Sequence, residues 1–177
     1  MLDRHLFDIV KNALGLEFVE NYPTDFDNRL IVQKVLYLLT HFKEDKRISL
    51  PYNWTFYLRG PYSSEIAHMM YYMNDFLPEL KNGHEFLEEK EKDALATFEQ
   101  FKEAIESYYL SDLDGSTLSR AELFETLATL TYIAKQVKDD REKLLSIFSG
   151  LKPSLAGQIT PLNLSKLCDI LESYQFI

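Results

Sequence analysis

The chain has 177 residues, and its 19 basic and 28 acidic side chains give a formal net charge of −9. Hydrophobic residues make up 46% of the sequence and aromatic residues 14%, which excludes an intrinsically disordered chain. No run approaches the roughly 18 consecutive apolar residues of a membrane span, and an acidic surface repels nucleic-acid phosphates. We therefore expect one cytoplasmic domain over residues 1–177, with neither a membrane nor a nucleic acid as its partner.

Helical periodicity dominates the N-terminal part of the chain. Only six glycines and six prolines interrupt the sequence, and this scarcity favours long helices. The spacing of apolar residues predicts a first helix over residues 2–15 and a second that begins at Thr24 or Asp25 and runs to about Phe42. The second helix is apolar around most of its circumference, so we expect it to lie at the centre of the fold.

One segment has the alternating pattern of a strand. Apolar and polar residues alternate from Tyr52 to Leu58, and residues 48–50 are expected to supply a short antiparallel mate. The sequence Gly60-Pro61-Tyr62-Ser63 then predicts a sharp turn whose last residue caps the next helix. The expected β element is therefore two- or three-stranded and lies near residues 47–59.

The rest of the chain predicts five more helices. Pro78 is expected to end the first of them, Ser119 and Glu122 form a capping box, and Thr160 precedes Pro161 at the start of the last. The five helices are expected over residues 64–77, 85–110, 120–137, 140–150 and 161–171. With the first two they predict a mainly α fold: a compact domain of six or seven helices with a small β element.

Recognised catalytic and cofactor-binding motifs are absent. The sequence has no glycine-rich phosphate loop, no His-Glu-x-x-His and no nucleophile elbow. The loop near residues 110–121 matches an EF-hand at Asp112, Asp114 and Gly115 but lacks its first and last ligands. The single cysteine, Cys168, falls on an apolar stripe, which is typical of a core residue. We therefore expect no enzymatic activity, no metal and no cofactor.

The positions of the four histidines bear on the expectation that the chain has no metal and no enzymatic activity. His5, His41, His68 and His84 lie in separate predicted elements, and no two have the spacing of metal ligands on a helix. An enzyme of unrecognised type would need Lys34, His41 and a carboxylate to meet in one pocket.

Two short stretches carry residues that local structure does not explain. In the turn before the third helix, glycine, proline and serine have structural roles, whereas Arg59 and Tyr62 do not. On the second helix, Lys34, Tyr37 and His41 fall together beside the apolar stripe, at relative positions i, i+3 and i+7.

These stretches resemble a known bacterial family. Residues 33–38, QKVLYL, resemble the QKxxYL helix of the YwgA-like family and of the related Panacea antitoxin domain. Residues 58–66, LRGPYSSEI, resemble their YGPYSxE(I/V) turn and helix, and residues 127–134 and 144–153 look like the YwgA-type C-terminal half. Order and spacing agree across about residues 25–175, so the whole chain is interpreted as a single YwgA/Panacea-like domain.

The resemblance implies a compact helical domain that acts through a protein partner. Members occur in phage-associated and mobile-element genes, Panacea domains neutralise toxins by direct contact, and the family has no known enzymatic activity. We therefore expect a non-enzymatic module that binds and masks a toxin or a host factor. Tyrosine, tryptophan and arginine carry much of the binding energy at interfaces. The expected contact residues are Lys34, Tyr37, Trp54, Tyr57, Arg59 and Tyr62.

Two alternatives stay open from the sequence. Residues 160–177 resemble the end of a winged-helix unit, in which a helix precedes a short strand, so a DNA-binding transcriptional regulator is the second hypothesis. The charges of this segment argue against DNA binding, because Lys166 could contact a phosphate whereas Asp169 and Glu172 would repel one. A homodimer is the other alternative, because the sequence leaves the oligomeric state open.

Overall fold

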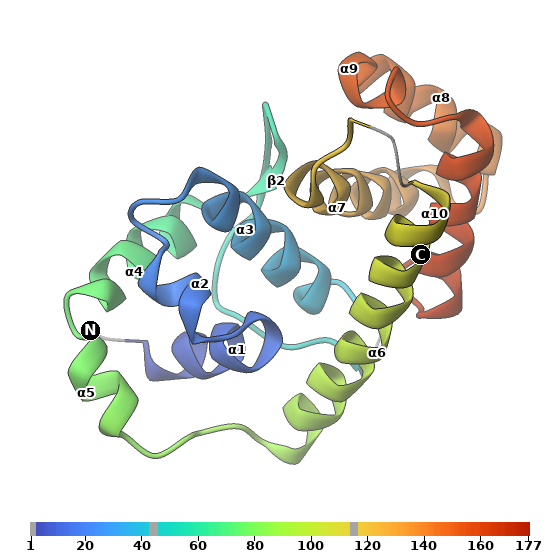
Figure 1. The fold of residues 1–177 in the computed structure, drawn as a ribbon. Coiled ribbons are helices and arrows are strands. Elements are labelled where there is room, and N and C mark those ends of the chain that lie inside the picture. The colour runs from blue at the N-terminus through green and yellow to red at the C-terminus, as the bar shows by residue number, and fades with distance from the viewer. Residues whose placement is uncertain (1–2, 43–45, 114–116) are drawn as a thin grey trace.

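The structure is a computed structural model that describes residues 3–42, 46–113 and 117–177. Within these ranges the chain forms ten helices and one two-stranded sheet (Figure 1). The seven longer helices are α1 (Arg4–Leu14), α3 (Phe26–Thr40), α4 (Ser64–Asn74), α6 (Glu89–Asp112), α7 (Arg120–Val137), α8 (Arg141–Leu151) and α10 (Pro161–Ser173). The predicted mainly α class is confirmed.

Three short helices bring the number above the six or seven that the sequence predicts. They are α2 (Leu16–Glu20), α5 (Leu77–Asn82) and α9 (Pro153–Ala156), each in a segment expected to be a turn or a connection. Pro78 does not end a helix as predicted, because it stands in the first turn of α5, where a missing N–H costs no hydrogen bond. The preceding helix, α4, ends earlier, at Asn74.

Five helix starts follow their predicted caps, whereas α6, expected from about residue 85, begins at Glu89. Side-chain oxygens accept a backbone N–H of the first turn, which satisfies a donor that the helix itself leaves free. The capping residues are Asp25 for α3, Ser63 for α4, Ser119 for α7, Asp140 for α8 and Thr160 for α10.

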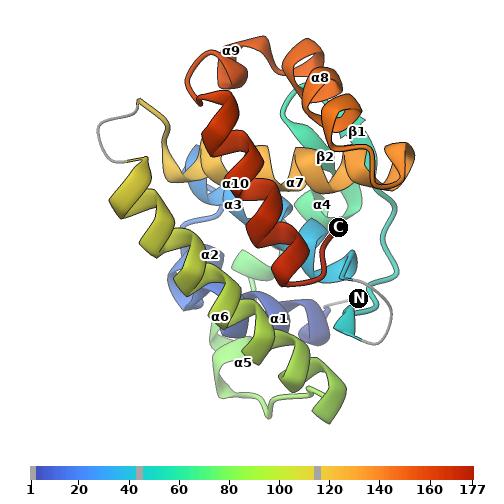
Figure 2. The same ribbon diagram turned by 90° about the vertical axis from the view of Figure 1, so that its right-hand side faces the viewer.

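Helices α3 and α7 pack against each other at the centre of the molecule. Every residue from Leu30 to Leu39 in α3 is buried, as is every residue from Glu125 to Thr131 in α7. Figure 2 shows α10 lying across α7 with α6 beside it, and α1 contacts both α3 and α6. These buried stretches include polar side chains, among them Gln33 and Lys34 in α3 and Glu125 in α7, so the two helices place polar groups in the interior.

The predicted small β element is confirmed as a two-stranded sheet, but its second strand and its turn differ from the prediction. Strand β1 (Thr55–Tyr57) pairs antiparallel with β2 (Gly60–Tyr62), and the turn between them is Leu58-Arg59. Residues 48–50 form no strand, and the expected Gly-Pro-Tyr turn is instead the second strand.

Proline is tolerated in β2 because of the register of the hairpin. Pro61 faces Phe56, one step beyond the pair Tyr57 and Gly60 that closes the turn. Hydrogen-bonded and non-hydrogen-bonded pairs alternate along an antiparallel ladder. The Pro61 position therefore needs no N–H directed at β1.

Candidate functional site

The hairpin is fixed to the central helix by two neighbouring side chains of α3. Gln33 Nε2 donates to the Ser63 carbonyl oxygen at 3.0 Å, and its Oε1 accepts from the Ser63 N–H at 2.9 Å. Lys34 Nζ donates to the Pro61 carbonyl oxygen at 2.7 Å. The two stretches that the sequence singles out therefore bind each other, and these bonds hold residues 61–63 extended.

A second set of charged groups holds the turn of the hairpin. Lys152, at the end of α8, donates from Nζ to the carbonyl oxygen of Leu58 and to Glu125 Oε1, the latter at 2.8 Å. The other oxygen of Glu125 accepts from Arg59 Nη1 at 3.3 Å. Glu125 and Lys152 are buried, with side-chain exposures of 4% and 6%, whereas Arg59 is half exposed.

Lys34 is a buried ammonium group without a carboxylate of its own. It is 1% exposed, and among the described residues its ammonium bonds only to Pro61 and forms no ion pair. Its pKa is lowered from 10.5 to about 7: burial is the largest cause, Glu125 acts in the opposite direction, and nearby Lys152 and Arg59 add to the lowering. An anion beside Lys34 would restore the charged form of this lysine.

A cavity of about 470 Å³ opens between the hairpin, the start of α3 and α4. Its size falls in the usual range for ligand pockets. Large apolar side chains that are exposed to solvent line it: Phe26 at 53%, Tyr57 at 63%, Leu58 at 82% and Tyr71 at 44%. Exposed apolar groups that gather at one place mark interaction sites more often than isolated ones do.

The charged residues that line this cavity are all basic. They are Arg29, Lys34 and Arg59, and no acidic residue lies among the lining residues. Both guanidinium groups sit by the Phe26 ring, with Cζ to centroid distances of 5.7 Å for Arg29 and 5.5 Å for Arg59. Cation–π contacts of this kind hold guanidinium groups in place at a partly exposed surface.

The structure divides the six predicted contact residues into two places. Lys34, Tyr57, Arg59 and Tyr62 line the cavity beside the hairpin. The other two, Tyr37 and Trp54, pack edge to face at 5.2 Å on a different part of α3. Tyr37 is 2% exposed and also stacks on His41 at 3.9 Å. This second pair holds the segment before β1 against α3, so Tyr37 has a packing role.

Sequence reasoning missed Phe26, Arg29 and Tyr71, which complete the cavity. Phe26 and Arg29 did carry a signal, because positions 26, 29 and 33 follow one side of α3 with Gln33. That side lies off the apolar stripe through Ile31, and an aromatic residue outside such a stripe has no core to enter. Tyr71 carried no comparable signal, since it belongs to an aromatic-rich helix.

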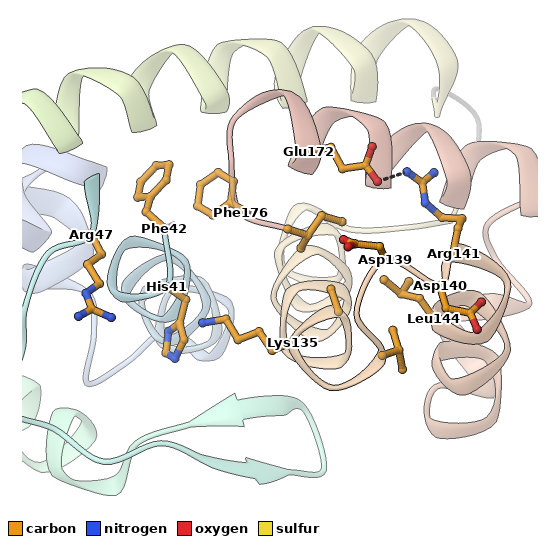
Figure 3. A pocket seen from close by; sticks show the side chains of 13 residues that line it. His41, Phe42, Arg47, Lys135, Asp139, Asp140, Arg141, Leu144, Glu172 and Phe176 are labelled. Atoms are coloured by element: carbon orange, nitrogen blue, oxygen red, sulfur yellow. Dashed lines mark hydrogen bonds and ion pairs between the residues drawn. The ribbon is translucent and has the colours of Figure 1, made fainter. Parts of the chain in front are cut away.

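A second cavity of about 290 Å³ lies between α3, α7 and the C-terminal segment (Figure 3). His41 and Lys135 approach it from neighbouring helices, and burial lowers the pKa of His41 to about 4. Acidic residues also line it, and Glu172 pairs with Arg141 across its far side. Acidic and basic residues thus line this cavity together, whereas the charged residues that line the hairpin cavity are all basic.

The two cavities separate the groups that an enzyme hypothesis would require together. Lys34 lines the cavity by the hairpin, whereas His41 lines the one in Figure 3. In the described ranges no group of three or more His, Cys, Asp or Glu side chains comes together as a metal site. Residues 114–116, in the segment compared with an EF-hand loop, lie outside those ranges.

Two further features concern DNA binding and membranes. Residues 174–177, after α10, form no strand. Among the described helices, none combines the length and the apolar character that crossing a bilayer requires.

Cys168 is buried in α10, and burial raises the pKa of its thiol to about 11.

Comparisons of the chain with protein-family models, with curated proteins and with solved structures found no match.

Proposed function

We propose that the chain is a non-enzymatic, antitoxin-like protein-interaction module of the cytoplasm that binds and masks a protein partner, a toxin or a host factor. The surface around the hairpin cavity makes the contact. The observation that carries this proposal is the gathering of Phe26, Tyr57, Leu58 and Tyr71, all solvent-exposed, around one cavity.

The composition of this surface supports a protein as the occupant. Aromatic residues and arginine are enriched at the energetic centres of protein interfaces, and here Arg29 and Arg59 flank an exposed phenylalanine ring. The hairpin that presents Leu58 is held by hydrogen bonds to buried groups, so little ordering entropy is lost on binding. The resemblance of residues 33–38 and 58–66 to the YwgA-like and Panacea families also supports a protein as the binding partner.

The test is a capture experiment in the native host with two matched leucine variants. Leu58→Ser removes the most exposed apolar side chain of the cavity, at 82%, and Leu162→Ser removes a leucine that is 66% exposed on α10. Both variants should fold as the wild type does, because neither side chain is buried. Partners are captured by crosslinking and quantified by mass spectrometry.

We expect Leu58→Ser to lower the yield of a specific partner about tenfold or more, whereas Leu162→Ser leaves it unchanged. Equal yields from wild type and Leu58→Ser would overturn the proposal, as would an equal loss from both variants. A toxin-like protein among the captured partners that regains its activity with Leu58→Ser would identify the masking role.

A further inference from the structure

The hairpin cavity is basic in an acidic protein. The chain carries a net charge of −9, yet every charged residue that lines this cavity is cationic. A cation-lined hollow within an acidic surface attracts anions locally and repels the rest of an acidic molecule. This contrast selects for one anionic group rather than for a large polyanion such as nucleic acid.

The charge balance beneath the hairpin leaves positive charge without a partner. In the part of the chain that the structure describes, Glu125 is the one carboxylate that pairs with these cations, and Lys152 and Arg59 use its two oxygens. Lys34 donates to the carbonyl oxygen of Pro61, and burial lowers its pKa to about 7, so a nearby anion would favour its protonated form. A buried cation is stabilised strongly when an anion comes within contact distance.

The groups beside these cations are apolar. Phe26, Tyr57 and Tyr71 are exposed along the cavity, and Leu58 closes its edge. A ligand that fills the cavity must therefore combine an anionic group with an adjoining aromatic or aliphatic group. Arg59 has the planar donor geometry that matches a carboxylate, and its guanidinium position is fixed by Phe26 and Glu125.

We propose that the hairpin cavity binds a peptide segment of the protein partner in which an acidic side chain adjoins an aromatic or aliphatic one. The carboxylate contacts Arg59 and lies near Lys34, and the apolar side chain packs on Phe26 and Tyr57. This inference rests on the proposed function and states the chemistry that the partner must present.

The test uses three blocked pentapeptides that differ at one position. They are acetyl-Gly-Phe-Glu-Leu-Gly-amide and its versions with Gln or Lys in place of Glu, titrated into the full chain at low salt. Binding is followed by NMR through the backbone amide of Gly60 and the side-chain Nε–H of Arg59. A fourth probe, 3-phenylpropionate, represents a free small anion with the same two chemical groups.

We expect the Glu peptide to bind about tenfold more tightly than the Gln peptide, because a charge-assisted hydrogen bond is worth roughly one such factor. The Lys peptide should not bind. Arg59→Gln should remove the preference for Glu, whereas Arg120→Gln, which removes the same charge from α7 outside the cavity, should preserve it. Lys34→Met should also reduce the preference, but Arg59→Gln is decisive because Arg59 is half exposed and its loss spares the core.

Three results would overturn the inference. Equal affinities of the Glu and Gln peptides would remove the role of the carboxylate, and an unchanged preference in Arg59→Gln would place the anion elsewhere. Binding of 3-phenylpropionate without binding of the Glu peptide would show that the cavity takes a free small anion instead. If the capture by wild type still depends on Leu58 while the peptides show no preference, the proposed function stands and this inference alone fails.

Discussion

Replacing Glu125 with glutamine should destabilise the fold far more than a surface charge change does. Lys152 Nζ lies 2.8 Å from Glu125 Oε1, and both side chains are almost fully buried. At an effective dielectric constant of about 20, this pair attracts with about 6 kcal/mol, which offsets a desolvation cost of several kcal/mol per ion. Glu125→Gln removes the attraction but leaves the buried Lys152 ammonium in place, so we expect a loss of about 3–5 kcal/mol.

Two companion variants separate the ion pair from the packing. Lys152→Met leaves Glu125 paired with the half-exposed Arg59, so the loss should be smaller, about 2 kcal/mol. The double variant Glu125→Leu, Lys152→Met removes both charges and should recover most of the stability, because apolar replacement of a whole buried pair is often neutral. Arg59→Gln should cost at most about 1 kcal/mol.

The measurement is the free energy of unfolding from guanidinium chloride titrations, followed by circular dichroism and fluorescence of Trp54. A domain of this size has roughly 5–15 kcal/mol of stability, so the single variants remain measurable. A loss below about 1 kcal/mol for Glu125→Gln would refute the reasoning. So would a double variant as unstable as the sum of the two singles, because that outcome would assign the effect to lost packing.

Two further predictions concern the same part of the fold. Gly60→Ala should lower the stability measured by thermal unfolding by about 2 kcal/mol or more, because φ of Gly60 is +84° and an added Cβ would lie 2.7 Å from Thr129 Oγ1. Gly150→Ala in α8 is the matched control: an added Cβ meets open space there, so this variant should be neutral or stabilising. Equal effects of the two substitutions would contradict this prediction. The unfolded chain keeps the Lys34 proton up to pH 10.5, while the folded chain releases it near pH 7, so stability should rise from pH 7 to 9 by up to about 1.4 kcal/mol per unit in the wild type relative to Lys34→Met. A parallel pH dependence of the two proteins would show that Lys34 titrates normally.

Most of the helices could be predicted from capping residues and from the periodicity of apolar residues. Helix starts at Asp25, Ser63, Ser119, Asp140 and Thr160 follow a local rule, in which a side-chain oxygen accepts a free N–H within the same turn. Such rules need only neighbouring residues, so one sequence is enough to apply them.

The hairpin could not be placed in the same way, because its register depends on distant groups. Gly60-Pro61-Tyr62 has the composition of a turn, and local reasoning favours that interpretation. Bonds from Gln33 and Lys34, about thirty positions earlier, hold these residues extended instead. The cavity was predicted in part for the same reason. Residues in the two motifs were found, Phe26 and Arg29 carried a signal in their spacing from Gln33, and Tyr71 of α4 required the packing of the helices.

The reach of Lys152 to the hairpin has a consequence for how the protein forms during synthesis. The Leu58 carbonyl and the Lys152 ammonium are separated by 94 positions along the chain. On the ribosome, the hairpin therefore leaves the exit tunnel long before the residue that fastens its tip. Until residue 152 emerges, Glu125 and the Leu58 carbonyl lack their shared cation, so the tip of the hairpin should become fixed only after the end of α8 has left the tunnel.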